Sequence, residues 1–208
     1  FTSNREHGGL MGYITATGEL VRLATPEGNL TAATADVKRP VFYALRGREV
    51  IEASPQITLS TSPDVRSKVL LSVRVIAQVP ERPATSLNGN CDGSRLALGI
   101  VGPGENPDAA IYTIDVNSGE VNEVCRIPNP PGFGGHVQWS HDNPYLLSFA
   151  GRINRLMVVD IRDKTPRAVY EEREHELVTH ESWWVDNQLM FCGGTHPKPT
   201  EDSHVKLL

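Results

Sequence analysis

Short turn motifs recur along this chain at nearly constant spacing, and each is followed by an apolar segment. The three clearest cases are Asp92-Gly93 before Leu96–Val101, Asp142-Asn143 before Tyr145–Phe149, and Asp186-Asn187 before Leu189–Cys192. Successive turns are 50 and 44 residues apart, close to the roughly 40 to 50 residues of a four-stranded propeller blade. Glycine and asparagine tolerate the positive φ of a tight turn, so each motif predicts a hairpin between antiparallel strands.

A second motif runs in phase with the first. Ala110–Asp115 and Arg155–Asp160 each read as a strand that ends on an aspartate before a turn, and the two aspartates are 45 residues apart. Tyr13–Leu23 is a weaker, earlier copy. β-branched residues, alternation and Gly or Pro punctuation prevail over helical periodicity along the whole chain. We therefore predict an all-β protein, a β-propeller that forms a single domain over residues 1–208.

The joints and ends of the chain fit this interpretation. Pro80–Pro83 and Pro128–Pro131 fall between units, where a missing backbone donor does least harm. Phe1–Arg5 reads as the end of a strand, and Val205–Leu208 as a strand that has barely started. We expect about five blades to be represented at least in part, with the domain incomplete at both ends.

The second unit departs from the pattern. Val41–Val50 predicts a hairpin, but Ile57–Val79 is longer and more irregular than one strand pair needs. We expect a hairpin followed by one elongated strand.

Composition excludes some classes of function. Apolar residues make up 39% and charged residues 22% of the chain, an ordinary balance for a globular protein. The net charge of −5 and the absence of a long Lys/Arg run argue against a nucleic-acid surface. No segment is long and apolar enough for a membrane helix. We expect no nucleic-acid or membrane partner.

Cysteine content and the start of the chain bear on the compartment. The three cysteines, Cys91, Cys125 and Cys192, have no short spacing, and we expect buried reduced thiols. No basic start followed by an apolar run is visible. We expect a cytoplasmic protein, with the periplasm as the alternative.

Two histidines fall at equivalent points of successive units. His136 lies in Gly134–Ser140, and His180 lies in Val178–Trp184, 44 residues later. Because equivalent strands of neighbouring blades lie side by side, the two imidazoles can converge on one site.

Several of these motifs resemble the oligogalacturonate lyases, seven-bladed propellers that cleave short pectin fragments by β-elimination. The resemblance rests on Phe-Thr-Ser-Asn-Arg at Phe1–Arg5, Asp-Val-Asn-Ser-Gly-Glu at Asp115–Glu120, Gly-His-Val-Gln-Trp-Ser at Gly135–Ser140, and Thr-His-Glu-Ser-Trp-Trp at Thr179–Trp184. It implies a uronate oligosaccharide as substrate, His136 as the base that removes the C5 proton, and His180 as one ligand of a divalent metal, usually Mn²⁺.

The chemistry suits these assignments. The C5 proton of a 4-linked uronate is weakly acidic until its carboxylate is neutralised, and a divalent cation can supply that neutralisation. A neutral imidazole is a suitable proton acceptor near neutral pH. Gln138 lies two residues after His136, so a strand period of two places it on the same face as a candidate substrate contact.

Two departures from the family stand out. The family completes its metal site with a Gln-x-x-His-x-His motif that these 208 residues lack. Thr195-His196-Pro197-Lys198 resembles it only in part, and we assign no ligand there. The family also has an arginine about two dozen residues before the base, where this chain has Ala110. We expect the substrate-binding arginine to be Arg152, with Arg126 as the alternative; the remaining alternative is that the activity has diverged from that of the family.

Other readings of these residues stay open. His136 can form a cross-strand hydrogen bond without a catalytic role, and Thr179-His180-Glu181 can be a polar cluster that ties two blades together. Core packing is favoured over sugar stacking for Trp139, Trp183 and Trp184. We expect His141 to be exposed, and His7 is a weak candidate to line the channel.

The alternative function is a non-catalytic propeller that binds a glycan or a protein partner, similar to the periplasmic TolB-like propellers. A peptidase-associated propeller is a weaker third possibility, because the chain has no Gly-x-Ser-x-Gly motif.

Overall fold

The protein folds into antiparallel sheets made from strands that are consecutive in sequence. A computed structural model describes residues 2–3, 9–62, 64–81, 85, 87–102, 104, 108–128, 133–195 and 204–208. Within them lie five sheets, which we call blades 1 to 5. Blade 1 contains β1 (Thr2–Ser3), β2 (Gly9–Ile14), β3 (Glu19–Thr25) and β4 (Gly28–Asn29), and blade 2 contains β5 (Thr31–Ala35), β6 (Phe42–Arg46), β7 (Glu49–Thr58) and β8 (Lys68–Gln78).

The remaining blades repeat this meander. Blade 3 contains β9 (Asn88–Gly89), β10 (Arg95–Val101), β11 (Ala109–Asp115) and β12 (Val121–Ile127). Blade 4 contains β13 (Phe133–Trp139), β14 (Leu146–Gly151), β15 (Leu156–Asp160) and β16 (Arg167–Ala168). Blade 5 contains β17 (Glu176–Trp183), β18 (Leu189–Thr195) and β19 (His204–Leu207).

The predicted turns join the first and second strands of three blades. The turn at Asp92-Gly93 precedes β10, the turn at Asp142-Asn143 precedes β14, and Asp186-Asn187 precedes β18. φ is positive at Gly93, Asp186 and Asn187, as such turns require. The all-β prediction and the phase of the repeats are therefore confirmed.

The hydrophobic core lies between successive blades. One cluster joins the faces of blades 2 and 3, with Tyr43, Val50, Leu98 and Ile114 fully buried or nearly so. A second joins blades 3 and 4, and two smaller ones join blades 4 and 5. Each sheet is thus stabilised by apolar area buried against its neighbours rather than within one central core.

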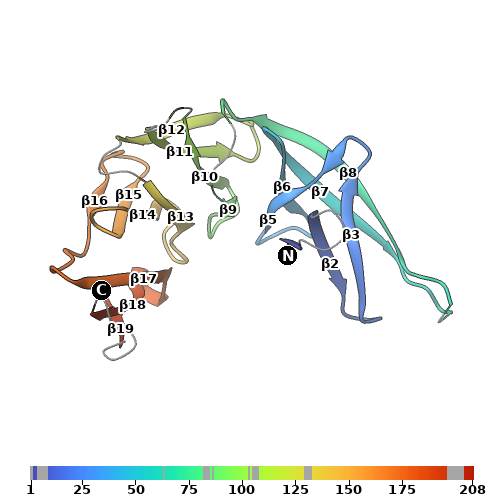
Figure 1. Ribbon diagram of the computed structural model, residues 1–208. Coiled ribbons are helices and arrows are strands. Elements are labelled where there is room, and N and C mark those ends of the chain that lie inside the picture. The colour runs from blue at the N-terminus through green and yellow to red at the C-terminus, as the bar shows by residue number, and fades with distance from the viewer. Residues whose placement is uncertain are drawn as a thin grey trace.

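The blades follow one another along an open arc (Figure 1). The first strands β9, β13 and β17 lie on the inner side of the arc, and the last strands β12 and β16 lie on its outer side (Figure 1). This is a propeller-like arrangement. The seven blades that the resemblance implies stay a prediction.

Blade 2 differs from the expected hairpin plus one elongated strand. Both β7 and β8 are long, and they pair with each other from Glu49–Gln78 to Thr58–Lys68. The irregular stretch after Ile57 is the turn at the tip of this extended hairpin rather than a part of one strand. Ser67 near the tip donates its backbone N–H to Glu19 of β3 at 2.9 Å, which fastens the hairpin to blade 1.

All three cysteines are free, Cys125 being buried and Cys91 and Cys192 half-buried. Burial raises the pKa of the Cys125 thiol to about 11, which keeps it protonated. In the part of the chain that the structure describes, no helix has the length and apolar character needed to cross a membrane.

Candidate functional site

The innermost strands of three blades share one irregularity. In each, two residues face a single residue of the next strand, which is a β-bulge. The flanking pairs are Thr31–Leu45 and Thr34–Tyr43 in blade 2, Gly135–Ala150 and Gln138–Ser148 in blade 4, and Thr179–Cys192 and Ser182–Met190 in blade 5.

The first residue of each bulge has a left-handed backbone. φ is 46° at Ala32, 56° at His136 and 53° at His180. Left-handed backbone costs a residue other than glycine roughly 1–2 kcal/mol. The two histidines therefore occupy equivalent, strained positions in successive blades, and both side chains are exposed. Because Ala32 holds the same conformation, the strain belongs to the bulge, and the histidine side chains are what blades 4 and 5 add to it.

Glu181 is the second residue of the blade 5 bulge, and its carboxylate lies at the interface with blade 4. Its side chain is only 1% exposed. Arg155 Nε donates to its Oε2 at 3.0 Å, and His136 Nδ1 lies 3.7 Å from its Oε1. Gln138 Nε2 also donates to the Glu181 backbone oxygen at 3.2 Å. Glu181, which follows His180 in sequence, thus contacts His136, Arg155 and Gln138.

Arg155 connects this site to a second acidic cluster. Its backbone N–H donates to Glu172, and burial raises the pKa of that carboxyl above its ordinary value. Burial alone would also raise the pKa of Glu176, but hydrogen bonds from Lys206 and Tyr170 lower it to about 2. Arg155 therefore contacts two carboxylates, Glu181 through its guanidinium and Glu172 through its backbone N–H.

Gln138 does not share a face with His136 in the way that strict alternation predicts. The bulge inserts one residue, so Gln138 keeps the face of Gly135. Its side chain lines a cavity of about 390 Å³ together with Asn88, Asn90, Cys91 and residues that follow it. His136 does not line this cavity.

Arg152 lies in the loop between β14 and β15, and its side chain is exposed. It lines a different cavity, of about 280 Å³, with Arg126 and the apolar side chains of Phe149 and Met157. The two arginines considered for substrate binding thus meet at one cavity, which His136 does not line. In contrast, Arg155 of the same loop does reach the His136 site.

The described residues do not form a complete metal site. Among them, no group of three or more His, Cys, Asp or Glu side chains could hold a metal ion. Within these residues, His180 provides one imidazole as a candidate metal ligand. The motif at Thr195–Lys198 and His7 lie largely or wholly outside the described residues.

The tryptophans mostly serve packing. Trp139 and Trp183 are 3% and 2% exposed, whereas Trp184 is 47% exposed. His141 is exposed, as expected. Sequence reasoning missed Arg155 and gave Glu181 only a structural reading, because their contacts join two blades and no local pattern reports them. The only available signal was an acidic residue next to His180, at the position where blade 4 has Val137.

Comparison of the structure with solved structures finds similar folds. An oligogalacturonate lyase from Vibrio parahaemolyticus matches with a TM-score of 0.72 at 15% identity, over 100% of this chain and 61% of that one. An oligogalacturonate lyase in complex with manganese also matches with a TM-score of 0.72, at 14% identity, over 97% of this chain and 59% of that one.

Kuenenia stuttgartiensis hydrazine synthase matches less well, with a TM-score of 0.53 at 14% identity, over 89% of this chain and 49% of that one. The chain therefore spans less than two thirds of the length of each of these proteins. No family model and no curated protein matches the sequence. At such identities the similarity establishes a shared fold.

Proposed function

We propose that the protein is a lyase that cleaves uronate oligosaccharides, oligogalacturonate above all, by β-elimination. The observation that carries the proposal is His136, an exposed imidazole on a strained bulge with a buried carboxylate beside it. The fold shared with two oligogalacturonate lyases supports the choice of reaction.

In the proposed reaction, the neutral imidazole of His136 accepts the C5 proton. The electrons of the C5–H bond form the C4–C5 double bond, and the C4–O bond breaks with the leaving sugar taking its electron pair. Arg155, 26% exposed and next to the site, adds positive charge where negative charge develops on the substrate. We propose Arg152 and Gln138 as further contacts to the sugar chain.

A divalent cation, Mn²⁺ by resemblance, would neutralise the substrate carboxylate when bound. We propose His180 as one of its ligands. The described residues do not complete a ligand set for it. Elemental analysis of protein purified without chelator tests this part, and near-stoichiometric Mn, Fe or Zn is the expected result.

The activity is tested by incubating the protein with digalacturonate and Mn²⁺ and following the ultraviolet absorbance of the unsaturated product. Wild type should produce it, and His136→Ala should lower kcat by on the order of 100-fold or more. If wild type gives no signal with pectate, alginate or ulvan fragments, the lyase proposal is wrong. Retained binding of a glycan in that case would instead favour the non-catalytic propeller.

A further inference from the structure

We infer that Glu181 is a positioning residue that holds the imidazole of His136 in the Nδ1–H tautomer. The inference deepens the proposed function, since it gives the base its orientation and leaves its Nε2 lone pair free. It is carried by a buried carboxylate whose Oε1 has no hydrogen-bond partner among the described residues and lies 3.7 Å from His136 Nδ1.

The fold alone does not require this carboxylate. Val137 fills the corresponding second position of the blade 4 bulge, and it is buried as an ordinary apolar residue. Glu181 is buried equally well but leaves one oxygen unsatisfied. An unsatisfied buried polar group costs about 1–3 kcal/mol. A side chain needed only to pair with Arg155 would gain nothing from presenting its second oxygen to a histidine.

Two contacts hold Glu181, one at its carboxylate and one at its backbone. Arg155 holds Oε2, and the amide of Gln138 holds the backbone oxygen of the same residue. The left-handed backbone of His136 in turn fixes the direction of its Cα–Cβ bond, from which the imidazole extends. Oε1 therefore has little freedom to turn away from Nδ1.

The distance of 3.7 Å is longer than a hydrogen bond. The His136 side chain is 52% exposed, so its ring has room for the small rotation that closes the gap. Catalytic hydrogen bonds are often long without substrate and tighten when it binds. A carboxylate that accepts from Nδ1–H fixes the tautomer of a histidine base in other enzymes as well.

Long-range ¹H–¹⁵N NMR of the purified ¹⁵N-labelled protein at about pH 8, where histidines are neutral, reads the tautomer directly. The His136 signals are assigned by their loss in His136→Gly. Wild type should show Nδ1–H, and Glu181→Gln should shift His136 toward Nε2–H, because the amide can donate to Nδ1. With digalacturonate, Glu181→Gln should lower kcat by on the order of 100-fold and change KM by less than about threefold.

Glu176→Gln is the matched control. Glu176 is a second, largely buried carboxylate of blade 5 that pairs with Lys206. This variant should lose stability and leave the His136 signals unchanged.

The inference is overturned if His136 is Nε2–H in wild type, a result that needs no variant to fold. It is also overturned if a folded Glu181→Gln variant keeps the wild-type tautomer. If Glu181→Gln shifts the tautomer of His136 but the wild-type protein cleaves no uronate, the positioning role of Glu181 is supported. The proposed reaction is then wrong.

Discussion

At the scale of single residues, the shared backbone of Ala32, His136 and His180 separates fold from function. All three start a bulge with positive φ, yet glycine is the residue that adopts this conformation without strain. In blade 2 the same bulge forms with Ala32, whose side chain is a single methyl group. The bulge therefore belongs to the fold, and the imidazoles are what blades 4 and 5 add to it.

Glycine substitution at these positions should relieve strain. Ala32→Gly is expected to raise the free energy of unfolding by up to about 1 kcal/mol, because relief of left-handed strain exceeds the entropy that glycine loses. His136→Gly should keep wild-type stability to within about 1 kcal/mol and lose the elimination activity. Urea unfolding followed by circular dichroism measures the first effect, and product absorbance measures the second.

Ala32→Gly is also the control for the histidine variant, since it has the same backbone change away from the site. If Ala32→Gly lowers the free energy of unfolding by more than about 1 kcal/mol, left-handed backbone does not strain the non-glycine residues at these positions.

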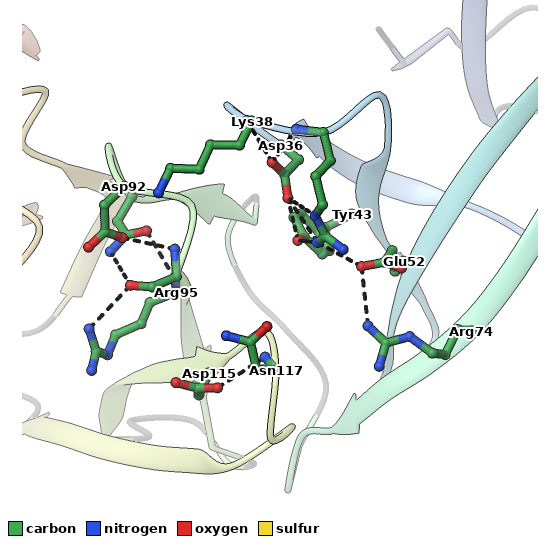
Figure 2. A network of polar contacts seen from close by, with 12 residues as sticks. Asp36, Lys38, Tyr43, Glu52, Arg74, Asp92, Arg95, Asp115 and Asn117 are labelled. Carbon is green, nitrogen blue, oxygen red and sulfur yellow. Dashed lines mark hydrogen bonds and ion pairs between the residues drawn. The ribbon is translucent and has the colours of Figure 1, made fainter.

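At the scale of elements, the turn between β5 and β6 is held by an ionic network that reaches toward blade 3. Figure 2 shows Asp36, Tyr43 and Glu52 within it, with Lys38 directed toward Asp92 of the neighbouring blade. The Asp36 carboxylate accepts from the Tyr43 hydroxyl at 2.7 Å and from the backbone N–H groups of Lys38 and Arg39. Its side chain is 2% exposed, so the Asp36 carboxylate is a buried anchor for the turn.

These contacts make the free energy of unfolding depend on pH in the acid range. Burial alone would raise the pKa of Asp36, but the hydrogen bonds lower it from 3.8 to about 2. Because the folded pKa lies below the unfolded one, the ionised form stabilises the fold fully above about pH 4. That contribution is lost as the pH falls through about 2.

Asp36→Asn should therefore lower the free energy of unfolding by about 2 kcal/mol at pH 7 and flatten its dependence on pH between about 4 and 2. Urea titrations over this range measure both effects. Asp64→Asn, at an exposed position in the β7–β8 tip, is the control and should change stability by less than about 0.5 kcal/mol. An unchanged acid dependence in Asp36→Asn would contradict the assignment.

At the scale of the whole molecule, the sequence predicts what is local and misses what joins blades. The turn motifs at Asp92, Asp142 and Asp186 set the phase of the blades, because turn chemistry is fixed by neighbouring residues. The pairing of Glu181 with His136 and Arg155 depends on how two sheets face each other, and no periodicity encodes it. The bulges were also hidden, since histidine and alanine replace the glycine that usually marks left-handed backbone.

A repeated contact connects the inner strands of successive blades. The indole N–H of Trp139 donates to the backbone oxygen of Asn88 at 3.1 Å, and that of Trp183 donates to the backbone oxygen of Gln138 at 3.2 Å. In both cases a buried tryptophan reaches back to the blade before it. The second contact lies beside the candidate site, because Gln138 also holds the backbone of Glu181.

Trp183→Phe should weaken the junction of blades 4 and 5 specifically. The change keeps an aromatic ring but removes the N–H and part of the buried volume, so we expect a loss of about 1–3 kcal/mol in the free energy of unfolding. Hydrogen exchange should rise in β17 more than in β10 and β11, which lie two blades away. Trp184→Phe, at the exposed neighbouring position, should change stability by less than about 0.5 kcal/mol. Equal losses in the two variants, or unchanged exchange in β17, would show that the junction is held by apolar packing without this hydrogen bond.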